Sequence, residues 1–186
     1  MAKQNTNSKK GFTIIEVVLV LAIAGLIFLM VFIALPALQR SQRNTRRRQD
    51  MARILSAFTE YASNNNGQIP EHNDATNGWQ LNNFVNNYVN GGGTQNASGS
   101  DTCTGDQFCD PDGSPYVINT PVKVTANNTQ VFNAGVSFSD AGHEIKYYTN
   151  ASCGSSENHV NLSNGSRDIA IFYMLEGGAV YCGDNH

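Results

Sequence analysis

A single carboxylate, Glu16, directly precedes a long apolar stretch. It is the first side chain along the sequence whose type and position indicate a chemical role. The 22 residues at 17–38 contain no charged side chain. A carboxylate inside such a stretch costs roughly 2.5–3.5 kcal/mol on membrane-insertion scales, unless a cation or the positive end of a helix compensates it. We therefore expect Glu16 either to lie at headgroup depth or to bind a cation within the apolar layer.

The apolar stretch is long enough to cross a membrane as one helix. At a rise of about 1.5 Å per residue it spans about 33 Å, close to the roughly 30 Å hydrocarbon core of a bilayer. No small-residue cleavage site of the A-x-A kind follows it, so we expect it to stay in the mature protein. Pro36 lies late in the stretch and is expected to kink the helix or open one turn.

The residues around Glu16 form a recognisable leader. Gly11-Phe12-Thr13-x-x-Glu16 is preceded by two lysines and followed by the unbroken apolar stretch. This combination resembles the type III leader of type IV prepilins and pseudopilins, over about the first fifty residues. The resemblance implies that a membrane-embedded aspartyl peptidase, the prepilin peptidase, cuts after Gly11 on the cytoplasmic side and then N-methylates Phe12.

The resemblance also gives Glu16 a role in assembly. In the pilin family this carboxylate pairs with the amino terminus of a neighbouring subunit, which for this chain would be the newly formed amine of Phe12. Such an amine is the kind of cation that a carboxylate in an apolar layer requires.

Charge is divided unevenly along the chain. Residues 1–53 hold nine Lys or Arg against two Asp or Glu, while residues 54–186 hold three against thirteen. This distribution argues against a nucleic-acid-binding domain as the main function. We expect an arginine cluster after the apolar stretch to face solvent or lipid headgroups, or to pair with acids of neighbouring subunits, with DNA binding as the less favoured alternative. Its members are Arg40, Arg43, Arg46, Arg47, Arg48 and Arg53.

The signals for membrane orientation conflict. Counted over the arginine cluster, the positive-inside rule places the C-terminal side in the cytoplasm. The four cysteines favour the opposite orientation, because all of them follow the apolar stretch and disulfides form outside the cytoplasm. We therefore expect the short N-terminal segment in the cytoplasm and the C-terminal part outside it.

The four cysteines are Cys103, Cys109, Cys153 and Cys182. They allow three pairings, of which closure of short loops favours Cys103–Cys109 with Cys153–Cys182. A zinc site is the alternative, but the chain has no C-x-x-C pair, and His143 and His159 are not at ligand spacing from the cysteines.

Three aspartates beside the first two cysteines are a weak candidate for a calcium site. Asp106, Asp110 and Asp112 fall within nine residues, and Asp110-x-Asp112-Gly113 resembles a fragment of a calcium loop. The segment lacks the bidentate glutamate and the regular spacing of an EF-hand, and Pro111-Asp112-Gly113 is also an ordinary turn sequence. We expect no cofactor, with calcium as the one alternative.

Periodicity predicts an α+β fold. Apolar residues at 51, 54, 55, 58 and 61 repeat every three or four positions, so the helix should continue to the break at 64–67. A short second helix should follow Asn77-Gly78, with Leu81, Phe84, Val85 and Tyr88 on its apolar face. Short strands are expected at 116–118, 121–125, 135–138, 144–149, 169–175 and 179–182, with a two-residue hairpin turn at Gly177-Gly178 between the last two. The long helix should pack on a small antiparallel sheet with disulfide-tied loops.

The resulting organisation is a cleaved leader at 1–11, a transmembrane and filament-core helix at 12–38, its amphipathic continuation at 39–64 and a head at 65–186. No G-x-S-x-G or H-E-x-x-H pattern occurs, so we expect no enzyme. By resemblance, we expect a type IV pilus subunit that is held in membrane lipid, processed by the prepilin peptidase and handed to a membrane assembly platform. It would then assemble with its own copies into an extracellular filament for adhesion, twitching motility or DNA uptake. A pseudopilin of a type II secretion or competence machine and a membrane-tethered monomeric binding domain are the alternatives.

Overall fold

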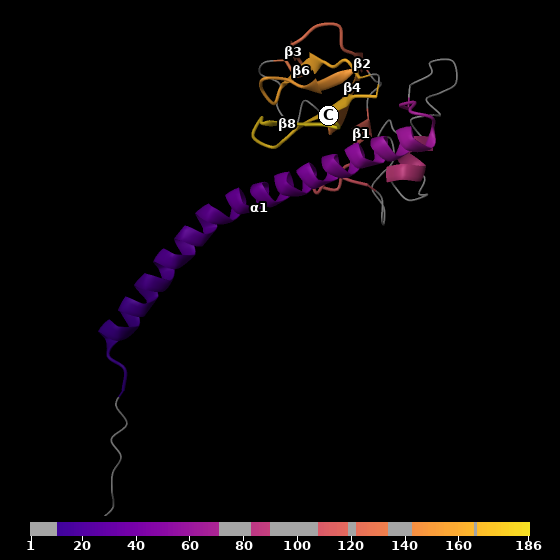
Figure 1. The fold of residues 1–186 in the computed structure, drawn as a ribbon. Helices are drawn as coiled ribbons and strands as arrows, with labels where there is room; N and C mark the ends of the chain where they lie inside the picture. The colour runs from indigo at the N-terminus through magenta and orange to yellow at the C-terminus, as the bar shows by residue number, and fades with distance from the viewer. Residues whose placement is uncertain (1–10, 71–82, 90–107, 119–121, 134–142, 166) are drawn as a thin grey trace, which may run out of the picture. The chain divides into compact units, whose positions relative to one another are not determined.

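The structure is a computed structural model that describes residues 11–70, 83–89, 108–118, 122–133, 143–165 and 167–186. The chain divides into two compact units, Met1–Ser41 and Gln42–His186. One long helix, α1 (Ile14–Asn64), contributes residues to both units (Figure 1).

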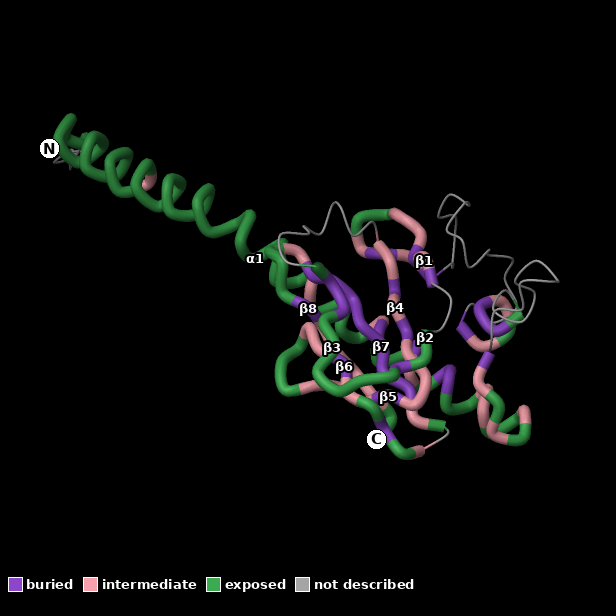
Figure 2. The backbone as a smooth tube through the Cα atoms, turned by 90° about the horizontal axis from the view of Figure 1, so that it is seen from above, coloured by how far each residue is buried: buried purple, intermediate pink, exposed green. Residues whose placement is uncertain are grey.

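In the first unit, α1 is an apolar helix whose side chains are nearly all exposed (Figure 2). Among the described residues, α1 is the one helix long and apolar enough to cross a membrane, judged by length and composition. Pro36 lies inside α1, and the helix continues through it. Contact between this apolar surface and water is unfavourable, so the surface needs lipid or other protein to cover it.

In the second unit, α1 places one face against the head. Its buried side chains are Arg47, Met51, Ile54, Ala57 and Phe58. The helix ends where the sequence predicts, at Asn64, since the Gly67 N–H donates to the Ala62 carbonyl at 2.7 Å. Asn66 and Gly67 both have positive φ angles, 57° and 81°, which terminates the helix with a left-handed turn.

The main sheet has five strands in the order β1-β4-β7-β8, with β2 also paired to β4. The strands β4, β7 and β8 are antiparallel to one another, whereas β1 and β2 run parallel to β4. The predicted α+β class is confirmed, but this sheet is mixed rather than wholly antiparallel. A strand of two residues is too short for its sequence to indicate whether it pairs parallel or antiparallel to its neighbour. The bounds are β1 Val117–Ile118, β2 Val122–Lys123, β4 Glu144–Thr149, β7 Ile169–Met174 and β8 Val180–Asp184.

A second, smaller sheet has three antiparallel strands in the order β3-β6-β5. They are β3 Thr129–Gln130, β5 Ala151–Cys153 and β6 His159–Leu162. None of these strands is predicted from the sequence pattern, because they are short and polar. The strand predicted at 135–138 lies outside the described residues. The second helix is represented by one π-helical turn, η2 (Val85–Val89), while Leu81 lies outside the described residues.

Strand β7 lies at the centre of the head and is buried along its whole length (Figure 2). Its odd-numbered residues, such as Ile171 and Tyr173, join the core that contains Met51, Ile54 and Phe58 of α1. Its even-numbered residues, such as Phe172, join a second core with Val160 of β6. Because strand side chains alternate between faces, β7 supports one core on each side of the main sheet.

The β7–β8 hairpin is closed by a three-residue loop. The Leu175 N–H donates to the Ala179 carbonyl at 2.7 Å, so the loop consists of Glu176, Gly177 and Gly178. Both glycines have positive φ angles, 95° and 86°, which glycine adopts without a steric penalty. The predicted two-residue turn is wrong by one residue, because Glu176 belongs to the loop.

A disulfide between Cys153 and Cys182 joins β5 to β8 and thereby links the two sheets. Its Cα atoms are 6.0 Å apart, within the usual range for such a bridge. Cys109 is also disulfide-bonded, and its predicted partner Cys103 lies outside the described residues.

Candidate functional site

The residues expected to be processed lie just before α1. Gly11, Phe12 and Thr13 precede the first residue of the helix and are exposed, Phe12 to 88%. A Cβ built on Gly11 would meet no heavy atom within 4 Å, so the backbone there is open to an approaching enzyme. The Gly11–Phe12 peptide bond is thus both accessible and outside the helix, as a protease substrate needs to be.

Glu16 and Thr13 together start the helix. The Glu16 carboxylate accepts from the Thr13 N–H at 3.1 Å and from the Thr13 hydroxyl at 3.0 Å. In return, the Glu16 N–H donates to the Thr13 hydroxyl oxygen at 3.4 Å. This reciprocal pair is a capping box, and its T-x-x-E pattern is a signal that the sequence itself contains. Because Thr13 is the N-cap, the helix begins after the Gly11–Phe12 bond and does not include it.

A second polar site lies wholly within the 42–186 unit, where α1 meets the head. We call it the arginine clamp and define it as Arg43, Arg47, Asp110 and Glu176. The Arg47 side chain is fully buried, and its Nε and Nη2 donate to the two oxygens of Asp110, each at 2.6 Å. Its Nη1 donates to Glu176 Oε1, also at 2.6 Å. One guanidinium therefore binds two carboxylates from distant parts of the chain.

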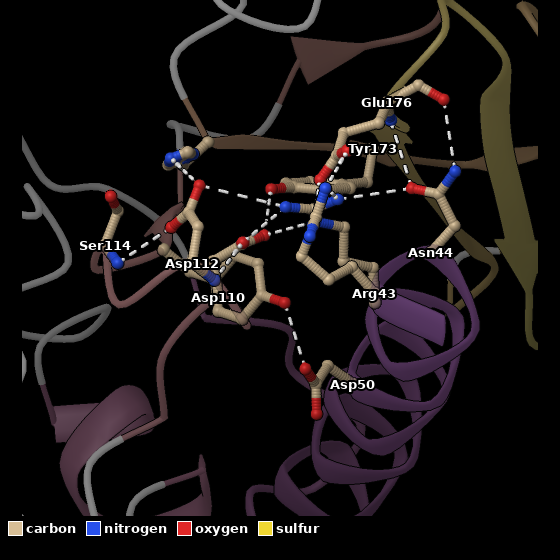
Figure 3. A network of polar contacts seen from close by, with 11 residues as sticks. Arg43, Asn44, Asp50, Asp110, Asp112, Ser114, Tyr173 and Glu176 are labelled. Atoms are coloured by element: carbon tan, nitrogen blue, oxygen red, sulfur yellow. Dashed lines mark hydrogen bonds and ion pairs between the residues drawn. The ribbon is translucent and has the colours of Figure 1, made fainter. Parts of the chain in front are cut away.

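Glu176 is held from α1 by three residues (Figure 3). Arg43 donates to both of its carboxylate oxygens at 2.7 Å, a bidentate pair of the stronger kind. The Asn44 side-chain amide donates to the Glu176 carbonyl at 3.1 Å and accepts from the Glu176 N–H at the same distance. These contacts explain why Glu176 belongs to the hairpin loop, because they hold its side chain and its backbone against α1.

Asp110 is positioned by a tight turn. The Asp110 N–H donates to the Ser114 carbonyl at 2.9 Å, and the Gly113 N–H donates to the Asp110 carbonyl at 2.8 Å. The Asp112 N–H and the Tyr173 hydroxyl donate to the Asp110 carboxylate at 3.0 and 2.8 Å. With the Arg47 contacts, every side-chain oxygen of this buried aspartate is satisfied.

The electrostatics of the clamp favour the charged forms. The Arg43 guanidinium, together with Arg47, lowers the pKa of Glu176 from 4.5 to about 2. Burial opposes ionisation of Asp110, but the Arg47 guanidinium outweighs it and lowers the pKa of this carboxyl. Burial also opposes the charge of Arg47, and its bonds to Asp110 and Glu176 nevertheless raise its pKa. Around these charges, burial raises the pKa of Tyr173, which stays a neutral hydrogen-bond donor.

The arginine cluster of the sequence analysis is therefore largely committed to the chain's own head. The expectation of a solvent- or headgroup-facing cluster is wrong for Arg47, which is buried. Arg53 is exposed and donates to the Val89 carbonyl of the head at 2.7 Å. Arg48 lies over the Tyr181 ring, with its guanidinium carbon 5.9 Å from the centroid. Arg46 remains exposed. The signal for Arg47 was present in the sequence, because it precedes Met51 by one turn and continues the apolar stripe.

The clamp also bears on the aspartates considered for calcium. Asp110 directs its carboxylate to Arg47, so a cation there would have to displace a buried guanidinium. Asp112 lies 3.1 Å from Nε2 of His143, and Asp106 lies outside the described residues. Within the part of the chain that the structure describes, no three metal-binding side chains come together.

One comparison with known proteins identifies the N-terminal segment. Residues 6–32 match the family model described as the prokaryotic N-terminal methylation motif. The match contains the exposed Gly11–Phe12 bond, the Thr13–Glu16 capping box and the first part of the apolar helix. No curated protein and no solved structure shows a significant match to the chain.

Proposed function

We propose that this chain, which carries the leader signature of type IV prepilins at residues 6–32, is a structural subunit of a type IV pilus. Cleavage after Gly11 and N-methylation of Phe12 yield a subunit held in the membrane by the apolar part of α1. Copies of the subunit then assemble into a helical surface filament in which that part of α1 is buried. The head lies on the extracytoplasmic side, where its disulfides form.

The observation that carries this proposal is the geometry at the start of α1. The Gly11–Phe12 bond is exposed and non-helical, and Glu16 lies in the first turn of the helix. Cutting that bond creates an amine next to the apolar surface in every copy. In a filament, the carboxylate of one copy can then bind the amine of another, and each compensates a charge that would be costly alone.

Two substitutions at Glu16 test the assembly step. Glu16→Ala removes both the charge and the capping box, while Glu16→Gln keeps an acceptor for the Thr13 N–H and removes only the charge. We expect both variants to be cleaved normally and to form no filaments, as seen by electron microscopy and by sedimentation of sheared cells. Since glutamine retains the cap, loss of filaments in Glu16→Gln assigns the defect to the charge.

Thr13→Ser serves as the matched control, since serine keeps the N-capping hydroxyl. This variant should be processed and should assemble. Wild-type filament yield from Glu16→Gln would contradict the charge pairing that the proposal assigns to this carboxylate.

A further inference from the structure

An open cleft of about 430 Å³ lies in the 42–186 unit beside the arginine clamp. One wall is α1, through Arg46, Gln49 and Asp50. The other wall is the turn at 109–113 that positions Asp110. The cleft is polar and large enough to admit a side chain from another molecule.

The α1 wall presents two polar side chains that make no hydrogen bond or ion pair with the described residues. These are Arg46 and Gln49, and both are exposed. They are three positions apart and so lie on the same side of the helix. A guanidinium with a neighbouring amide matches a carboxylate, because the planar fork of arginine can donate two parallel hydrogen bonds to it.

The carboxylates that line the cleft are already engaged. Asp50 accepts from the Tyr116 hydroxyl at 2.9 Å, and Asp110 is paired with Arg47. Burial raises the pKa of Asp50, and it outweighs the charge on Arg46, which lowers that pKa without forming a described ion pair with Asp50. Arg46 therefore makes no ion pair among the described residues, and its guanidinium can pair with an anion from outside the molecule.

We propose that this cleft receives an acidic side chain from the head of a second copy of the chain, with Arg46 as its ion partner and Gln49 as a hydrogen-bond donor. The inference rests on the proposed function, since a filament of identical subunits must join one surface to a different surface of the next copy. The chain supplies the complement, because residues 54–186 hold thirteen acids against three basic residues. Glu60 and Glu157 are exposed and have no partner among the described residues.

Charge reversal tests this contact in assembled filaments of the full chain. Arg46→Glu should leave processing intact and raise the amount of unassembled subunit about two- to fivefold at physiological salt, as one exposed ion pair would. Arg46→Lys keeps the charge but loses the planar fork, so its assembly should fall between that of Arg46→Glu and wild type. Arg167→Glu makes the same charge change as Arg46→Glu at an exposed site away from the cleft and should stay near wild type. Equal assembly of Arg46→Glu and wild type would overturn the inference, as would an equal defect in Arg167→Glu.

A chemical cross-link identifies the partner. Arg46→Lys places an amine in the cleft, and a carbodiimide joins an amine to a carboxylate only when they are in contact. In filaments mixed from isotopically labelled and unlabelled subunits, we expect a cross-link from the introduced lysine to an Asp or Glu of another subunit. Absence of any intersubunit cross-link in intact filaments would refute the contact. Absence of filaments and of processing in the wild type would instead refute the proposed function.

Discussion

Replacing Arg47 with methionine tests the arginine clamp at its centre. Methionine can fill the buried volume of the side chain, but it leaves the fully buried Asp110 without its cation. Removing one partner of a buried ion pair costs about 3–5 kcal/mol, because the remaining charge is neither solvated nor paired. For a unit of this size that corresponds to a drop of roughly 10–15 °C in the melting temperature.

Thermal unfolding of the full chain in detergent, followed by near-ultraviolet circular dichroism, measures this drop. Arg46→Met is the matched control, because Arg46 is adjacent in sequence but exposed and should change stability by less than about 0.5 kcal/mol. Adding Asp110→Asn to Arg47→Met should restore more than half of the loss, since the buried charge is gone while an acceptor for Tyr173 remains.

The account of the clamp fails if Arg47→Met melts within about 2 °C of the wild type. It fails equally if Arg46→Met is as destabilising as Arg47→Met, because burial would then have no part in the effect.

Two further predictions concern acid and the disulfide. Arginine contacts lower the pKa of Glu176 from 4.5 to about 2. The ionised Glu176 therefore contributes its full stabilisation above about pH 4.5 and loses it as the pH falls towards 2. The free energy of unfolding should fall over that range by at most about 3 kcal/mol for this group. Urea unfolding across that range should show the loss, and Glu176→Gln should flatten it. Cys153→Ala with Cys182→Ala should lower the unfolding free energy by about 3–4 kcal/mol, measured by the same method, because the bridge closes a separation of 29 residues.

Both predictions have clear contrary outcomes. An unchanged acid transition in Glu176→Gln would show that another carboxyl controls it. Unchanged stability of the double cysteine variant would show that the contacts between the two sheets suffice without the covalent link.

The sequence was sufficient for the elements that periodicity and turn chemistry specify. The extent of α1 follows from an uncharged apolar stretch and then an apolar stripe that ends at an Asn-Gly pair, and the structure ends the helix at Asn64. The β7–β8 hairpin follows in the same way from alternating apolar residues and two adjacent glycines. These signals are local, so they predict the elements without knowledge of the tertiary fold.

The arginine clamp could not be derived in that way. Arg47 and Asp110 are 63 positions apart, and Arg47 and Glu176 are 129 apart, so no local pattern joins them. A run of arginines after a membrane-spanning stretch is usually a solvated surface. This general expectation is stronger than the one local signal for burial, which is the position of Arg47 on the apolar side of the helix. Strands β1 and β2 fall within the predicted strands at 116–118 and 121–125, but their parallel direction could not be predicted, because it is set by pairing with β4.

The clamp gives the head a defined attachment to its own helix. In the 42–186 unit, Arg43 and Arg47 fasten the β7–β8 hairpin and the turn at Asp110 to α1. Aromatic packing fixes the same helix further along, where Phe58 stacks on Phe84 with ring centroids 4.3 Å apart. These contacts keep the head from shifting along α1 within this unit.

The most direct test of the central claim is the amino terminus of the mature protein. Mass spectrometry of the N-terminal peptide, from chain purified out of cells that contain a prepilin peptidase, reads the cut site and the modification together. The account predicts a peptide that begins with N-methylated Phe12. A mature chain that retains Lys9, Lys10 and Gly11, or that begins at any other residue, would contradict it.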